Sequence, residues 1–95
     1  MQAPLWGPLD GHHARLIKWP VNAVPVPLHK HTADLRIVVI SGTYVYAANG
    51  EPEKEYGPGS FISTPGGTPH SARSPAGCVF LEEVDGKFDS IPVSR

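Results

Sequence analysis

The chain has 95 residues, a formal net charge of −1 and 40% hydrophobic residues. This length allows a single domain with a modest core, which we assign to residues 1–95. The near-zero charge provides no basic surface, which argues against nucleic acid and anionic membranes as partners.

The cysteine content and the N-terminal residues bear on the compartment. Cys78 is the only cysteine, so no internal disulfide can form, which is typical of a reducing compartment. The first residues, MQAPLWGPLDG (1–11), contain neither a basic leader nor an apolar run of signal-peptide length. No segment is long and apolar enough to span a membrane. We therefore expect a soluble protein of the cytoplasm.

The pattern along the chain favours an all-β fold. Eleven prolines, ten glycines and the lack of a sustained 3.6-residue apolar period argue against helices. The prediction, in chain order, is strands over 14–19, 33–40, 43–48, 60–64, 70–74 and 78–84, an extended connector or edge over 20–28, a polar turn over 49–59, and a last edge strand in the tail over 85–95. Seven or eight short antiparallel strands then form one barrel.

Two histidines one residue apart stand just before the strongest predicted strand. In an extended chain, residues two apart project from the same face, so His29 and His31 point together. Leu35 and Ile37 share their parity if no bulge intervenes, which puts the histidine pair on the apolar, interior side. Buried imidazoles without hydrogen bonds or a metal are costly.

A third histidine follows the turn PGGTP (65–69). This turn resembles a hairpin tip, and a hairpin is what could return His70 to the pair. On spacing alone, two interpretations are open. Either His29 and His31 flank the entrance of a strand at the barrel mouth and His70 is unrelated, or the three residues bind a metal.

The surrounding motifs resemble those of small single-domain cupins. The first cupin motif is H-x-H, three or four residues, Glu, six residues and Gly; HKHTADLRIVVISG supplies His29, His31, Leu35 and Gly42. The second motif is G, five residues, P-x-G, two residues, H, three residues and N; GPGSFISTPGGTPHSARS supplies Gly59, Pro65, Gly67, His70 and Ser74. The segments APLWG (3–7) and DGKFD (85–89) also resemble small bacterial cupins.

The resemblance implies a double-stranded β-helix, or jelly-roll, barrel. It also implies that His29, His31 and His70 converge on one divalent metal ion, which could be Fe, Mn, Zn, Ni or Cu. Gly42 and Gly59 would then turn the chain at the ends of the two motif hairpins, where positive φ angles are expected.

Leu35 stands where many cupins have a glutamate ligand, and a leucine cannot bind a metal. Three interpretations follow. The site is a true three-histidine site with open positions, as in three-histidine cupin dioxygenases or in Lewis-acid catalysis. Alternatively, a replacement ligand completes it: Asp34, which would need a bulge, or His12 and His13 folded over the mouth. Or the site has lost its metal, and the pocket binds an organic ligand or nothing.

Aromatic residues and the cysteine have both structural and functional interpretations. Tyr44 and Tyr46 share a face, where one hydroxyl could contact a metal-bound oxygen, although barrel packing is the commoner use. Trp6 and Trp19 are expected to cover the barrel or form a dimer contact. Cys78 begins a strand and is expected to pack in the interior.

Charged residues near the motifs are expected mostly on the outside. Glu82 and Glu83 are adjacent on one strand, so at most one points inward. Arg36 and Arg73 have the parity of the outer face. We find no acid or base positioned for catalysis.

These observations lead to a metal-dependent cupin enzyme with dioxygenase-like or Lewis-acid chemistry on a small organic substrate. The apolar cavity is expected around Leu35, Ile37, Val39 and Phe61. The alternative is a non-catalytic metal-binding or sensor cupin. We also expect a homodimer, because a minimal barrel leaves sheet edges and apolar patches uncovered.

Overall fold

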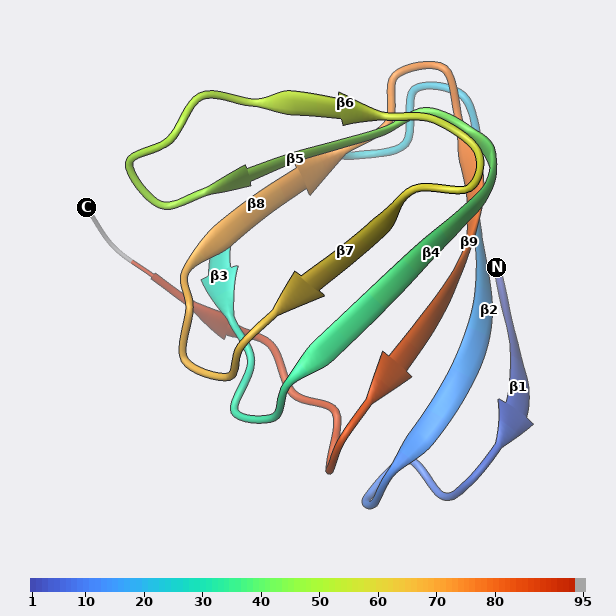
Figure 1. Ribbon diagram of the computed structural model, residues 1–95, viewed down its shortest axis with the longest axis vertical. Coiled ribbons are helices and arrows are strands. Elements are labelled where there is room, and N and C mark those ends of the chain that lie inside the picture. Colours follow the sequence, from blue (N-terminus) through green and yellow to red (C-terminus); the bar gives the residue numbers. More distant parts are fainter. Residues whose placement is uncertain (94–95) are drawn as a thin grey trace.

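The computed structural model describes residues 1–93 and contains only strands and connecting turns there (Figure 1). The strands are β1 (Gln2–Trp6), β2 (His13–Trp19), β3 (Val26–Lys30), β4 (Leu35–Gly42), β5 (Tyr44–Ala48), β6 (Lys54–Tyr56), β7 (Phe61–Thr64), β8 (His70–Arg73), β9 (Cys78–Val84) and β10 (Ile91–Pro92). Within this part of the chain, no helix is long and apolar enough to cross a membrane.

Two five-stranded sheets enclose the interior (Figure 1). Their strand orders are β1-β2-β9-β4-β7 and β10-β3-β8-β5-β6, and every pairing is antiparallel. Strands far apart in the sequence therefore lie side by side, as β9 does between β2 and β4. This arrangement is a jelly-roll barrel, and it confirms the predicted all-β, double-stranded β-helix fold.

The core follows the two-residue period of the strands. In β9, Cys78, Phe80, Glu82 and Val84 are buried, whereas the residues that alternate with them are partly exposed. In β4, Leu35, Ile37 and Val39 are each at most 2% exposed. This alternation buries one face of each sheet, and the two buried faces pack against each other.

The predicted strands correspond to β2, β4, β5, β7, β8 and β9 within about two residues. The edge strand predicted in the tail over 85–95 corresponds to the short β10, at one edge of its sheet, and its last two residues, 94–95, lie outside the described residues. Three strands were not predicted. β1 lies in an N-terminal segment for which no element was predicted, and β6 lies in the segment predicted as a polar turn. β3 lies in the proline-rich connector. Its pairing with β8 is irregular between Val26 and His29. Pro27, which has no backbone N–H, therefore lies where the sheet needs no hydrogen-bond donor.

The assumed strand continuity between His29 and Leu35 was wrong. His29 belongs to β3 in one sheet and Leu35 begins β4 in the other, with a turn between them. Both residues face the interior nevertheless, because the two sheets enclose the same space. Phe61 was also assigned wrongly to the cavity: it is 59% exposed and lies on the outer face of β7.

Gly42 and Gly59 have φ angles of 77° and 86°, as expected for the ends of the motif hairpins. Only Gly42 is also held in a tight contact. A Cβ atom there would lie 2.2 Å from the Gly77 carbonyl oxygen. Gly50 has a similar φ of 81° but no atom within 4 Å of the corresponding position.

We therefore expect Gly50→Ala to lower the free energy of unfolding by about 1 kcal/mol, from the left-handed backbone alone. Gly42→Ala adds a backbone clash and should cost about 3 kcal/mol or more. Urea denaturation of both variants measures the difference. Equal losses of unfolding free energy in the two variants would contradict the importance of the close approach between Gly42 and the Gly77 carbonyl.

Candidate metal centre

Three histidines lie close together inside the barrel, and they come from β3, from the turn directly after β3 and from β8. His29 in β3 and His70 in β8 are register partners, and His31 follows β3 directly. The ring centroids are 4.3 to 5.1 Å apart. One nitrogen from each ring lies within 4.8 Å of the other two, and the residues are 2 to 7% exposed. The structure thus brings together all three residues that the sequence singled out.

Each ring is oriented by a backbone carbonyl. The Nδ1 atoms of His29, His31 and His70 lie 2.7, 2.5 and 2.9 Å from the carbonyl oxygens of Pro27, Asp89 and Thr68. A carbonyl only accepts, so each Nδ1 must carry the proton. The Nε2 lone pairs then remain free to bind a cation, which is the usual arrangement around ligating imidazoles.

Burial favours the neutral form of two of these imidazoles. Desolvation lowers the pKa of His29, and the nearby charge of Glu82 opposes this only weakly. Desolvation also lowers the pKa of His70 to about 4, helped by repulsion from His29 and His31. Neutral imidazole is the form that ligates metals. The three residues therefore fit a divalent transition-metal ion.

The proposed replacement ligands lie elsewhere. Leu35 is 2% exposed and packs in the core. Asp34 is exposed and accepts a hydrogen bond of 2.7 Å from the Gly66 backbone amide, which fixes the neighbouring turn. His12 lies 2.7 Å from Glu83 on the surface, and His13 bonds the Gly11 carbonyl. The structure therefore brings no replacement ligand from these residues to the three histidines.

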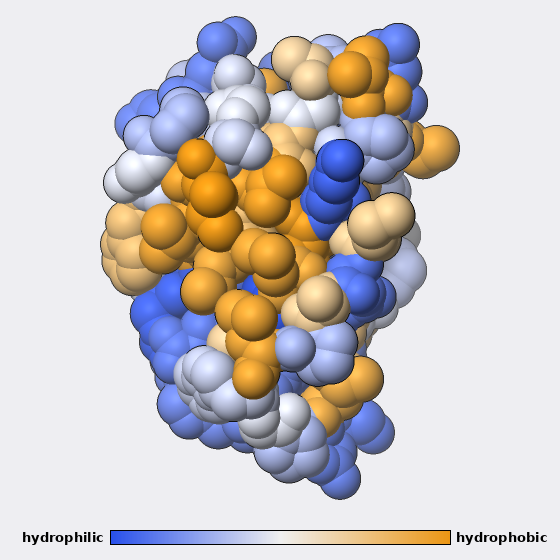
Figure 2. All heavy atoms as spheres, turned by 90° about the vertical axis from the view of Figure 1, so that its right-hand side faces the viewer, coloured by the Kyte–Doolittle hydropathy of each residue, from blue (hydrophilic) through white to orange (hydrophobic). Residues whose placement is uncertain are grey.

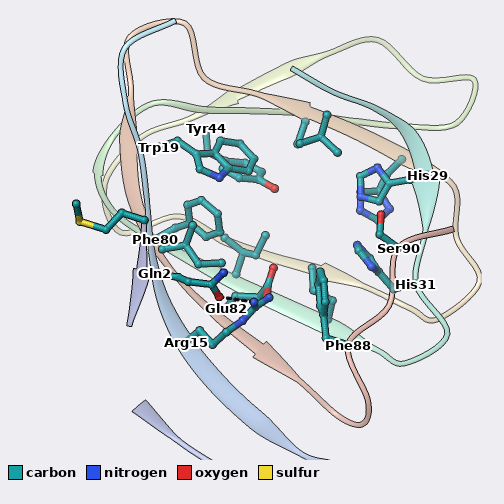
Figure 3. A pocket seen from close by; sticks show the side chains of 17 residues that line it. Gln2, Arg15, Trp19, His29, His31, Tyr44, Phe80, Glu82, Phe88 and Ser90 are labelled. Carbon is teal, nitrogen blue, oxygen red and sulfur yellow. Dashed lines mark hydrogen bonds and ion pairs between the residues drawn. The ribbon is translucent and has the colours of Figure 1, made fainter. Parts of the chain in front are cut away.

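A cavity of about 290 Å³ adjoins the histidines (Figure 3). Its walls are mainly apolar and come from both sheets: Met1, Ile17, Trp19, Val26, Leu35, Ile37, Tyr44, Ala72, Phe80 and Phe88. Polar groups enter from Gln2, Arg15, Glu82 and Ser90. A small, mostly apolar space with a few convergent polar groups is typical of a ligand site.

An ion pair in one wall of the cavity was not predicted. Glu82 in β9 and Arg15 in β2 are register partners whose side chains are each 9% exposed, and Arg15 donates to Glu82 Oε1. Arg15 also lies over the Phe88 ring, 4.4 Å from its centroid. The prediction that at most one of Glu82 and Glu83 points inward was correct, but sequence parity could not tell which one.

The aromatic residues divide between the core and the site. Tyr44 stacks on Trp19 at 5.3 Å, and burial raises the pKa of its hydroxyl. Tyr46 is near the centre: its ring lies 5.4 Å from His70, and its hydroxyl is 2.8 Å from Thr64 Oγ1. Trp6, in contrast, is 48% exposed.

Cys78 and the two outer arginines also lie as expected. Cys78 is buried, and burial raises the pKa of its thiol. Arg36 pairs with Glu83 and Arg73 with Glu53 on the outside, so neither reaches the cavity.

The fold and the motif positions agree with one protein family. The cupin domain family matches residues 15–82, which contain all three histidines. The chain belongs to the cupin family. None of the curated proteins matches this cupin by sequence.

Several solved structures share its fold at low identity. The DMSP lyase DddQ from Ruegeria pomeroyi DSS-3 has a TM-score of 0.79 and 24% identity over 98% of this chain and 50% of that protein. A cupin superfamily protein from Desulfitobacterium hafniense DCB-2 has a TM-score of 0.79 and 13% identity over 92% of this chain and 77% of its own. A double-stranded β-helix protein from Klebsiella pneumoniae has a TM-score of 0.76 and 15% identity over 98% and 84%. The chain thus spans half the length of the lyase, and these likenesses establish the fold alone.

The low pKa of His70 predicts how the metal-free protein responds to acid. The unfolded chain takes up a proton at this residue near pH 6.5, whereas the folded chain resists it until about pH 4. The free energy of unfolding should therefore fall by up to about 3 kcal/mol as the pH drops through this window. Urea denaturation between pH 7 and pH 4 tests this, with His70→Gln expected to show a smaller decline. Equal declines would contradict it.

Proposed function

We propose that this cupin binds one divalent transition-metal ion through His29, His31 and His70 and acts as a metal-dependent enzyme on a small organic molecule. The convergence of three buried imidazoles, all fixed as Nδ1–H tautomers by backbone carbonyls, carries the proposal. A structural histidine cluster would have no need for three unprotonated nitrogens facing one another.

The position of the cavity supports a catalytic role for a bound metal ion rather than metal storage. The three histidines lie in its wall, so a molecule in the cavity can approach an ion held there directly. With three protein ligands, positions remain open on the ion, which is typical of catalytic sites, whereas structural sites are closed. A bound ion would supply Lewis-acid polarisation of a substrate oxygen or, if it is iron, activation of dioxygen.

The protein contributes binding and exclusion of water. Trp19, Tyr44 and Phe80 pack against one another at one end of the cavity, with ring centroids 5.0 to 5.3 Å apart, and form a rigid apolar wall. Such a wall holds the carbon skeleton of a substrate and limits its water contacts. The lack of a carboxylate ligand leaves more positive charge on the ion than in sites that contain one, which favours anionic or strongly polar substrate oxygens.

The loss of one ligand tests the centre. We expect wild-type protein, produced without a histidine tag, to bind one metal per chain, and His70→Ala to weaken binding by about 100-fold or more. His12→Ala removes a surface histidine outside the centre and should change nothing. Elemental analysis and titration with Zn(II) and Fe(II) give the stoichiometry, and circular dichroism checks the fold. A wild-type protein without stoichiometric metal would refute the proposal.

Activity separates an enzyme from a non-catalytic binding protein. The Fe(II) form should consume dioxygen with a substrate if the chemistry is oxidative, and the Zn(II) form should turn over a substrate anaerobically if it is Lewis-acid chemistry. We expect at least one form to be active on a panel of small hydroxy and oxo acids. Tight metal and ligand binding without turnover in any form would instead indicate the sensor alternative.

A further inference from the structure

The cavity contains a buried ion pair that the metal centre does not use. Among the ion pairs of residues 1–93, only Arg15–Glu82 has both side chains less than one tenth exposed. The other buried residues of β9 are Cys78, Phe80 and Val84, so a single carboxylate interrupts an otherwise apolar stripe.

This ion pair is not explained by stability. Burying two charges costs several kcal/mol of desolvation, and apolar residues of similar size are often as stabilising or more so. The arginine is also imperfectly satisfied, because its Nε–H has no partner within residues 1–93. A buried pair of this kind in a ligand cavity therefore favours a functional role.

One oxygen of the Glu82 carboxylate is available to accept a hydrogen bond from a ligand. Glu82 Oε1 accepts from Arg15, whose guanidinium is held in turn by the Gln2 amide oxygen at 2.5 Å. No hydrogen bond joins Glu82 Oε2 to another residue of the described chain, and this oxygen is not among the fully enclosed unpaired atoms. Figure 3 shows the Glu82 side chain directed into the cavity, on the wall away from His29. An acceptor without a partner in a nearly apolar cavity calls for a donor on the ligand.

We propose that Glu82 Oε2 accepts a hydrogen bond from a neutral hydroxyl group of the substrate and that Arg15 positions it. This inference rests on the proposed function. The substrate is then a small hydroxylated carboxylic acid or related oxo compound, with its anionic oxygen toward the three histidines and its hydroxyl toward Glu82. A neutral donor fits better than an ammonium group, because Arg15 already balances the carboxylate charge.

The cavity size agrees with a small substrate. Its volume of about 290 Å³ corresponds to the space of about ten water molecules at roughly 30 Å³ each. The Phe88 ring lies between the histidines and the ion pair, 5.5 Å from the His31 ring and beneath the Arg15 guanidinium. It therefore provides an apolar surface on which a short carbon chain can pack.

The test compares matched ligands on Zn(II)-loaded protein by calorimetry. The probes are unsubstituted carboxylic acids with two to five carbons, and the same acids with a terminal hydroxyl or a terminal amine. We expect a hydroxy acid of the right length to bind about tenfold more tightly than its unsubstituted partner, as for a hydrogen bond to a charged acceptor.

Replacing the pair together avoids leaving a buried charge alone. Arg15→Leu/Glu82→Leu should keep the fold and the one-to-one Zn(II) binding but lose the tenfold preference. Glu83→Gln, one residue along β9 and on its outer face, should keep it.

Each outcome is decisive. Wild-type protein that binds Zn(II) but shows no hydroxyl preference, or a preference that survives in the double variant, would overturn the role of Glu82 and leave the metal centre standing. Tighter binding of the amino acids would overturn the neutral-donor assignment. Wild-type protein that binds no metal would refute the proposed function and this inference with it.

A different observation concerns the outer face of the sheet β1-β2-β9-β4-β7. One apolar residue from each strand lies beside the next across its full width: Ala3, Leu16, Leu81, Val38 and Phe61 are successive register partners. We call this row and the adjacent Ile40 the apolar sheet face. Val38, Ile40 and Phe61 are 36, 49 and 59% exposed. Figure 2 shows apolar side chains gathered in the middle of this side of the molecule.

The charges at the two ends of this face differ in sign. Lys18, the register partner of Val79, is exposed beyond one end. At the other end lie Glu83 and Asp85, which both contact Arg36 and His12. Two carboxylates against one arginine give this group a formal charge of −1 with His12 neutral. A twofold axis through the centre of the row would bring the Lys18 end of one copy onto the acidic end of the other.

We infer that a second copy of this chain covers the apolar sheet face in an isologous dimer. The apolar row would form the dry centre of the interface, and the opposite charges would fix the relative orientation of the two copies. His29 and His70 belong to the other sheet, so this interface does not cover the strands that carry them.

Sedimentation equilibrium at 10 to 100 µM tests this inference. We expect twice the chain mass of 10.2 kDa, and a shift to the monomer for Val38→Asp, which puts a charge in the centre of the row. Val24→Asp changes an equally apolar residue, 88% exposed in the β2–β3 connection, and should leave the dimer unchanged. A wild-type monomer throughout the range, or a Val38→Asp dimer of unchanged affinity, would overturn the inference.

Discussion

The pairing of β3 with β8 is the constraint on which the three-histidine group depends. It makes His29 and His70 direct neighbours across a ladder, although forty residues of chain separate them. The backbone hydrogen bonds of the sheet thus set the distance between two rings before any ion arrives. His31 completes the group from the turn where the chain leaves one sheet for the other. A preformed site of this kind loses little conformational freedom on binding, which favours tight and specific coordination.

Different chemical groups line different walls of the cavity. One wall carries neutral nitrogen donors, the opposite wall carries an ion pair with no net charge, and aromatic rings close one end. Because the surroundings are apolar, each polar group is poorly screened and acts strongly on whatever enters. A molecule that binds both walls would be oriented at two points.

The sequence allowed the fold class, most strands and the three-histidine group to be predicted, because these depend on local alternation and on motif spacing. Leu35 was recognised as a departure from the glutamate pattern, and it is in fact a core residue. Two features depended on strand order and escaped prediction. The first is the Arg15–Glu82 pair, since sixty-six residues separate its partners in the chain. The second is the outward position of Phe61, because period-two reasoning gives two faces without saying which one is inside.

The hydrogen bond between His31 Nδ1 and the Asp89 carbonyl joins the centre to the C-terminal segment. The Asp89 carboxylate also accepts a hydrogen bond of 2.8 Å from the Thr32 amide, so this segment is bound to the turn that contains His31. Asp89 lies seven residues past the end of the family match. The orientation of one imidazole is therefore set by a segment outside the family match, and changes in that segment would turn the ring without altering any of the three histidines.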